Sequence, residues 1–82
     1  MLIFLTRHGC HLCDEARSLV EREVKRRHLT LHEVDIDSDD SLLEAYRERI
    51  PVLLGPDDLV IAEGRIESAP LRRALRNWTS AH

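Results

Sequence analysis

The sequence predicts an α/β fold in which a four-stranded mixed sheet carries helices on both faces, in the order β-α-β-α-β-β-α. Three observations predict it. The chain opens with a short run that is apolar on both faces, continues into a long amphipathic segment, and later places two short apolar runs around a strong turn signal. At 82 residues, the chain is expected to form one domain with a small core.

The first strand and the first helix have the clearest pattern. Leu2–Leu5 is apolar throughout, as in a central strand that helices cover on both sides. The segment 11–27 repeats apolar residues at helical spacing, for example at Ala16 and Val20. Acids stand near its start and bases at its end, where the helix dipole favours them. A strand followed by such a helix predicts a parallel βαβ unit.

Alternation and capping residues mark the second strand and the second helix. Residues 31–37 alternate apolar and polar side chains, which predicts a half-buried or edge strand. The polar run 38–41 offers N-cap residues. A short helix is expected after it, with inward-facing side chains at Leu42, Leu43 and Tyr46.

The last third of the sequence predicts a hairpin and an amphipathic helix. Two apolar runs, 52–54 and 59–62, flank the turn signal Gly55-Pro56-Asp57-Asp58. Ser68 can cap a final helix, because the apolar residues that follow it keep helical spacing. These residues are Leu71, Ala74, Leu75 and Trp78.

Composition and charge exclude several classes of protein. With 43% hydrophobic and 33% charged residues, the chain is expected to be globular rather than disordered. Its net charge of −3 disfavours nucleic-acid binding, which needs positive charge to neutralise phosphates. Apolar runs such as Leu2–Leu5 are too short to span a bilayer or to act as a signal peptide. We therefore expect a cytoplasmic monomer with neither nucleic-acid nor membrane partners.

The only two cysteines, Cys10 and Cys13, lie between the first strand and the first helix. Residues three apart share a helix face, so their sulfurs can reach disulfide geometry if Cys10 caps the helix. Free amides and the positive end of the helix dipole would then lower the pKa of Cys10. Arg7, His8 and His11 can add positive charge nearby. Cys13 lies further into the helix and should be better shielded.

This C-x-x-C motif predicts a redox pair, in which the Cys10 thiolate attacks a disulfide and Cys13 resolves the product. His11 stands between the cysteines and can tune their potential. Two other interpretations remain open at this point. The thiols could simply be buried core residues. A zinc site could use Cys10 and Cys13 with two histidines. No second C-x-x-C is present, and His28 and His32, although four residues apart, straddle the predicted turn from helix to strand, so no metal is expected.

The segment Thr6–Cys13 resembles the active-site segment of glutaredoxins, in which a basic residue commonly stands three positions before the first cysteine. The element order, the helix length and the proline before the third strand are similar to the thioredoxin fold. The resemblance runs from Leu2 to about Trp78 and is closest to small bacterial glutaredoxin-like proteins with a C-x-L-C centre. It implies a single glutaredoxin-like domain over residues 1–82.

The resemblance also implies roles for site residues. Cys10 would be the nucleophile and Cys13 the resolving thiol. Arg7 would support the thiolate or a glutathione carboxylate. Pro51 would be cis and face the cysteines, while the backbone of Ile50 would pair with an extended thiol substrate.

A substrate carboxylate could also bind at the start of the last helix. The amides there can hold an anion, and Arg65 could assist them. The implied activity is thiol–disulfide exchange on protein or small-molecule disulfides, with no tightly bound cofactor. Glutathione or a thioredoxin reductase system would return the cysteines to thiols. The alternative is a non-catalytic module that docks a partner, or that holds an iron–sulfur cluster between two chains with glutathione as co-ligand.

Overall fold

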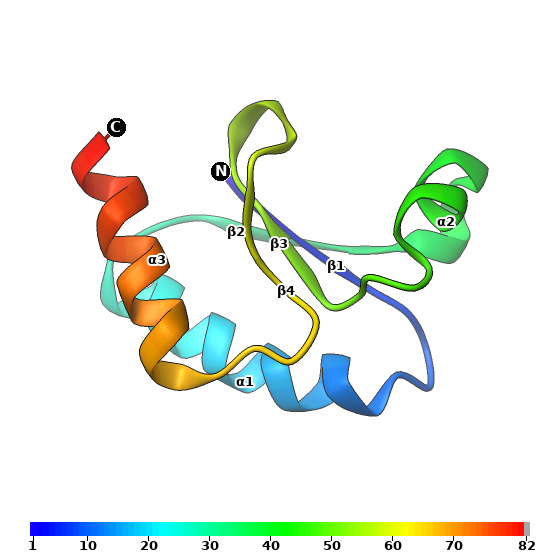
Figure 1. The fold of residues 1–82 in the computed structure, drawn as a ribbon, viewed down its shortest axis with the longest axis horizontal. Coiled ribbons are helices and arrows are strands. Elements are labelled where there is room, and N and C mark those ends of the chain that lie inside the picture. Colours follow the sequence, from blue (N-terminus) through cyan, green and yellow to red (C-terminus); the bar gives the residue numbers. More distant parts are fainter. Residues whose placement is uncertain (82) are drawn as a thin grey trace.

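The computed structural model describes residues 1–81, with side chains as far as Ser80, and has the expected order of elements (Figure 1). The strands and α-helices are β1 (Leu2–Thr6), α1 (His11–Arg26), β2 (Leu31–Asp35), α2 (Asp40–Tyr46), β3 (Val52–Leu54), β4 (Val60–Glu63) and α3 (Ser68–Ala81). Two short 3₁₀ turns follow β2 and β3. The predicted fold class is confirmed.

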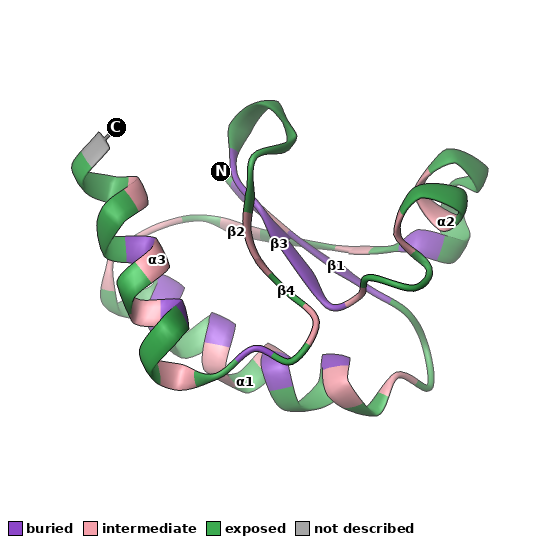
Figure 2. Cartoon of the chain, in the orientation of Figure 1, coloured by how far each residue is buried: buried purple, intermediate pink, exposed green. Residues whose placement is uncertain are grey.

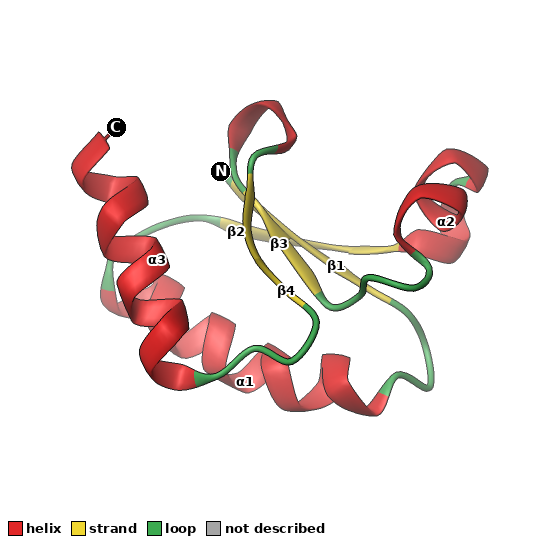
Figure 3. Ribbon diagram, in the orientation of Figure 1, coloured by secondary structure: helices red, strands yellow, loops and turns green. Residues whose placement is uncertain are grey.

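The four strands form one mixed sheet in the order β2-β1-β3-β4 (Figure 3). β1 pairs with β2 in parallel and with β3 antiparallel, and β3 pairs with β4 antiparallel. Leu5 lies opposite Val34 on one side and Val52 on the other. β1 is therefore a central strand and β2 an edge strand, as predicted, and the βαβ unit has its parallel pair.

Each face of the sheet has its own hydrophobic core, because successive side chains of β1 and β3 point in opposite directions. Phe4 and Leu53 pack with α1 and α3 on one face. Leu5 and Val52 pack with the segment around α2 on the other face. Figure 2 shows the buried residues concentrated on β1, β3 and the sheet-facing sides of α1 and α3. The expectation of helices on both faces is confirmed, with two helices on one face and one on the other.

α1 buries a charged residue, Glu23, which the sequence pattern did not single out. Only 1% of its side chain is exposed, and Arg27 Nη1 lies 2.6 Å from Glu23 Oε1. Arg26 Nη1 and Arg22 Nε approach the other oxygen at 3.5 and 3.7 Å. The hydrogen bond from Arg27 lowers the pKa of Glu23 below its ordinary value of 4.5, against the opposing effect of burial. Glu23 lies three residues after Val20, which places it beside the buried stripe of the helix.

The second strand ends at Asp35, two residues before its predicted end. The Asp35 side chain accepts a hydrogen bond from the backbone N–H of Asp37 at 2.8 Å, and Ser38 Oγ donates to the Asp35 carbonyl at 2.7 Å. These bonds turn the chain into the 3₁₀ segment Ile36–Ser38. The alternation of residues 31–37 continued past the strand because Ile36 is buried in the core under α2 rather than in the sheet.

The predicted hairpin is present, but its second strand is shifted by one residue. Asp57 and Asp58 have φ values of 57° and 59°, and Gly55 N–H donates to the Leu59 carbonyl at 2.7 Å. The turn therefore includes Leu59, and the strand begins at Val60. The last helix also differs in detail, because it begins at Ser68 itself.

Candidate functional site

The site begins where β1 ends at Thr6 and the chain turns into α1. The Cys10 N–H donates to the Arg7 carbonyl at 3.2 Å, which closes the turn. Gly9 has a φ of +80°, a conformation that suits a residue without Cβ. The Asp14 N–H then donates to the Cys10 carbonyl at 3.1 Å, so α1 starts immediately after the turn. Cys10 is the N-cap of the helix, as the motif predicted.

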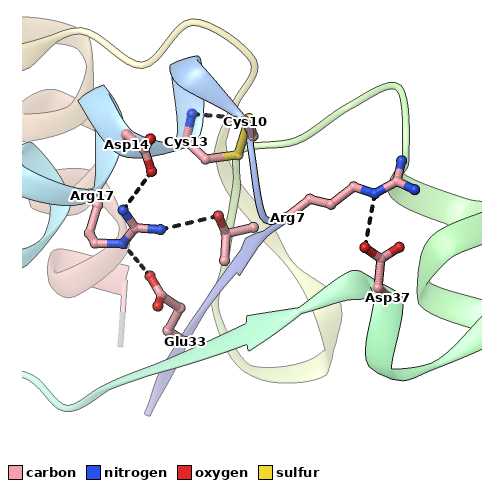
Figure 4. Close-up of a disulfide and its surroundings, with 8 residues drawn as sticks. Arg7, Cys10, Cys13, Asp14, Arg17, Glu33 and Asp37 are labelled. Atoms are coloured by element: carbon pink, nitrogen blue, oxygen red, sulfur yellow. Dashed lines mark hydrogen bonds and ion pairs between the residues drawn. A yellow bond between two sulfur atoms is a disulfide. The ribbon is translucent and has the colours of Figure 1, made fainter.

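Cys10 and Cys13 form a disulfide, with their Cα atoms 5.2 Å apart (Figure 4). The Cys13 N–H also donates to Cys10 Sγ at 3.1 Å. Cys13 is completely buried, whereas Cys10 is partly exposed. The two cysteines therefore differ in access: solvent reaches part of Cys10, whereas Cys13 is closed to it. The expected shielding of Cys13 is confirmed.

The Ile50–Pro51 peptide bond is cis, as the resemblance implied. The pairing of Leu5 with Val52 places Pro51 at the same end of the sheet as Thr6, where the cysteine loop leaves β1. Pro51 is buried, and the Ile50 N–H donates to the Tyr46 carbonyl at 3.1 Å. That amide is engaged within the chain, so pairing with a substrate would use the Ile50 carbonyl. The contact of these two residues with a substrate stays a prediction.

Arg7 does not contact the disulfide. Its Nε lies 3.1 Å from Asp37 Oδ2, and Figure 4 shows the side chain directed away from the sulfurs. Both side chains of this ion pair are 43% exposed. The backbone of Arg7 thus lies in the turn that carries Cys10, and its guanidinium group contacts the segment that follows β2.

A second guanidinium, that of Arg17, ties the first turns of α1 to the sheet. Its Nε lies 2.6 Å from Glu33 Oε1, its Nη1 lies 2.9 Å from Asp14 Oδ1, and its Nη2 donates to Thr6 Oγ1 at 3.4 Å. The hydrogen bond with Glu33, followed by that with Asp14, raises the pKa of Arg17 above its ordinary value. Arg17 therefore stays charged and neutralises the acid next to Cys13.

These groups surround an open pocket of about 520 Å³ beside the cysteine loop. It is lined by Thr6, Arg7, His8, Gly9, Asp14, Arg17, Glu33 and Asp35. From the sequence, the residues of α1 and β2 in this group were not predicted to bind a substrate, and only Asp14 was expected to act near the cysteines, as a negative charge. One rule could have found Asp35: parallel neighbours end at the same edge of a sheet, so the end of β2 meets the residues that follow β1.

The other predicted site residues lie apart from the sulfurs or out in solvent. The His11 side chain is largely exposed, and its Nε2 lies 3.4 Å from Glu15 Oε1. Arg65 lines a separate pocket of about 180 Å³ between β4 and α3, and no cysteine lines that pocket. The loop that leads to it is tied to the cis-proline segment, because the Gly64 N–H donates to the Pro51 carbonyl at 2.8 Å. Roles for His11 and Arg65 in substrate binding stay predictions.

The described residues contain neither a candidate metal site nor a helix that could span a membrane. Residues 1–81 contain no group of three or more His, Cys, Asp or Glu side chains that could hold a metal ion. None of the helices in this part of the chain has the length and apolar character that crossing a bilayer requires.

The mixed sheet, the C-x-x-C disulfide at the start of α1 and the cis-proline before β3 define a thioredoxin-fold protein. Over residues 1–76 the chain matches the family described as "Glutaredoxin-like domain (DUF836)". The chain belongs to this family.

Solved structures share the fold. Target protein XcR50 from X. campestris is 30% identical, with a TM-score of 0.76 over 100% of this chain and 99% of that one. Protein Ne2328 from Nitrosomonas europaea is 26% identical, with a TM-score of 0.74 over 94% and 87% of the two chains. Thioredoxin 1 from Thermosipho africanus has a TM-score of 0.73 over 98% and 94% of the chains, but at 8% identity it supports the fold alone. No curated protein matches this chain.

Proposed function

We propose that this protein is a thiol–disulfide oxidoreductase in which Cys10 is the nucleophile and Cys13 the resolving thiol. The observation that carries the proposal is the unequal burial of two cysteine residues whose sulfurs are bonded to each other. Cys10 is partly exposed at the N-cap of α1, and Cys13 is buried one turn further in. A redox pair that exchanges with an outside molecule needs one accessible sulfur and one protected sulfur.

The reaction starts from the dithiol. The Cys13 N–H and the positive end of the α1 dipole stabilise a thiolate at Cys10, which increases the fraction of the nucleophile at neutral pH. The thiolate forms a bond with one sulfur of the substrate disulfide, and the other sulfur leaves as a thiolate that takes a proton from solvent.

Cys13 completes the reaction. It loses its proton and attacks Cys10 Sγ in the mixed disulfide, which releases the second substrate thiol and leaves the Cys10–Cys13 bond. Two electrons pass from the cysteine pair to the substrate. An external thiol, from glutathione or a thioredoxin reductase system, then reduces the pair again. The cycle needs no tightly bound cofactor and suits a cytoplasmic monomer, because that compartment keeps thiols reduced.

The substrate is a protein or small-molecule disulfide that reaches Cys10 from solvent. The carbonyl of Ile50, which belongs to the cis peptide, supplies a backbone acceptor at the same end of the sheet, so an extended peptide can pair there. Arg65 and the first amides of α3 supply a site for a carboxylate on a longer substrate.

The test is a reduction assay combined with alkylation of the dithiol form. The reduced protein is expected to convert bis(2-hydroxyethyl) disulfide to thiol when coupled to glutathione or to thioredoxin reductase. Replacement Cys10→Ser should lower the rate more than about 10³-fold, because it removes the nucleophile. Replacement Cys13→Ser should retain mixed disulfides on Cys10, detectable by mass spectrometry. The Cys10 alkylation rate against pH should follow a thiol pKa well below about 8.5.

Two results would overturn the proposal. The first is a Cys10 thiol that titrates like a free cysteine. The second is failure of the protein to reduce any disulfide under either reducing system. The second outcome would favour a docking module, and a brown colour on anaerobic purification would favour a cluster scaffold.

A further inference from the structure

We propose that Asp37 is a specificity-determining residue, which holds Arg7 in an ion pair and thereby selects uncharged or cationic disulfides over those that carry carboxylates. This inference rests on the function proposed above and narrows its substrate class. It concerns the charge of the group attached to the sulfur that Cys10 attacks.

Arg7 is the cation most directly connected to the nucleophile. Its carbonyl accepts the hydrogen bond from the Cys10 N–H at 3.2 Å, so its side chain starts within the turn that presents Cys10. An arginine at this place could hold a substrate carboxylate. In this protein its Nε instead lies 3.1 Å from Asp37 Oδ2, and Figure 4 shows it turned away from the sulfurs.

The position of Asp37 is fixed independently of Arg7. The Asp37 N–H donates to Asp35 Oδ1 at 2.8 Å at the start of a 3₁₀ turn, which holds its backbone beside the end of β1. The carboxylate is thus presented to Arg7 by the fold, and a substrate carboxylate has to displace it. Because both partners are 43% exposed, the displacement is feasible but unfavourable.

The second guanidinium near the loop offers no alternative anchor. Arg17 already pairs with Glu33 at 2.6 Å and with Asp14 at 2.9 Å. The pocket beside the loop also contains Asp35, so its lining has three carboxylates and two guanidinium groups. An incoming carboxylate meets repulsion there, whereas an ammonium group does not.

The expected size of the effect on substrate preference follows from the solvent exposure of the Arg7–Asp37 ion pair. Exposed guanidinium–carboxylate pairs shift an equilibrium by about two- to fivefold. Replacement Asp37→Asn leaves Arg7 free to meet a substrate carboxylate and removes one negative charge. The rate with an anionic disulfide, relative to a neutral one, should therefore rise about two- to fivefold.

The experiment compares three symmetric disulfides of similar size and different charge. These are cystamine, bis(2-hydroxyethyl) disulfide and 3,3′-dithiodipropionate. The fully reduced protein is mixed with each in excess, and the second-order rate constant is followed by the appearance of the free thiol. For the natural sequence we expect the lowest rate with the dithiodipropionate. Asp37→Asn, and also Asp37→Ser, should raise the anionic-to-neutral ratio, and the rise should shrink in high salt.

Two control variants separate the ion pair from the net charge. Asp40→Asn removes an exposed carboxylate at the start of α2 that does not pair with Arg7. It should leave the ratio close to that of the natural sequence. The double replacement Arg7→Gln with Asp37→Asn should abolish the gain, because the gain acts through Arg7. Unfolding curves of each variant confirm that the fold is retained.

The outcomes distinguish the two proposals. An unchanged ratio in both Asp37 variants, or an equal rise in Asp40→Asn, overturns the role of Asp37 while the oxidoreductase proposal stands. If the unsubstituted protein reduces none of the three disulfides, the oxidoreductase proposal fails, and the proposed role of Asp37 fails as well.

Discussion

The two ends of α1 use the same chemistry in opposite ways. At the C-terminal end, Arg27 Nη1 lies 2.6 Å from Glu23 Oε1, and the exposed fractions of the two side chains are 23% and 1%. At the N-terminal end, Arg17 Nε lies 2.6 Å from Glu33 Oε1, but the exposed fractions are 33% and 45%. The nitrogen–oxygen distance is the same in the two pairs, whereas the burial of their side chains differs. The buried pair is expected to stabilise the fold, and the exposed pairs near the cysteines to control which charges approach.

The largest effect is expected at the buried end. Replacement Glu23→Ala leaves the half-buried Arg27 without its carboxylate. It also removes the carboxylate that lies among Arg27 and two arginines of α1. The unfolding free energy should fall by about 3 kcal/mol, which corresponds to a Tm lower by roughly 10–20 °C. Unfolding by denaturant measures this loss of free energy. The exposed Glu21→Ala on the same helix serves as control and should cost less than about 0.5 kcal/mol. Equal losses in the two variants would contradict the comparison.

The dependence of stability on pH tests the role of the buried Glu23 pair further. The pKa of Glu23 is lower in the folded protein than its ordinary value of 4.5, because Arg27 donates to the carboxylate. Its contribution to stability is therefore fully present above pH 4.5 and is lost as the pH falls through the folded pKa. Glu23→Gln should cost about 1.5–3 kcal/mol near neutral pH, and progressively less in acid. A cost that stays constant between neutral pH and pH 3 would show that the charge is not what matters.

The smallest effect is expected at the exposed end. Replacement Arg17→Gln breaks the contacts with Asp14 and Glu33, both of which are largely accessible to water. The unfolding free energy should fall by no more than about 1 kcal/mol, and salt should reduce the difference. Alkylation of Cys10 should become slower at neutral pH, because Asp14 loses its counter-charge beside the cysteines. A loss above 2 kcal/mol would mean that the two ends are structurally alike.

Local patterns in the sequence predicted most of the fold. The stripe that includes Ala16 and Val20, the apolar run of β1 and the hairpin signal each lie within one segment, so neighbouring residues carry the information. The predicted end of β2 was wrong because the side chain of Asp35 caps a turn there. The turn ends the strand although the alternation of apolar and polar residues continues to residue 37. Glu23 was missed because a charged residue is rarely fully buried, although its spacing from Val20 placed it beside the stripe.

The candidate site was predictable only in part. The cysteines are close in sequence, so their disulfide and the N-cap at Cys10 followed from helical spacing. Arg7 and Asp37 are 30 residues apart, and Arg17 and Glu33 are 16 apart. Such pairs form only after β1 and β2 lie side by side, and no periodicity within one segment reports them.

The complete burial of Cys13 next to Cys10 also predicts how the reduced protein would react with a peroxide. A peroxide that arrives from solvent would meet Cys10 first and convert its thiolate to a sulfenic acid. Cys13, which the peroxide cannot reach, is already within bonding distance. Its thiol condenses with the sulfenic acid, water leaves, and the disulfide closes before further oxygen can add. The arrangement would thus divert Cys10 from irreversible sulfinic damage into a state that ordinary cellular thiols can reverse.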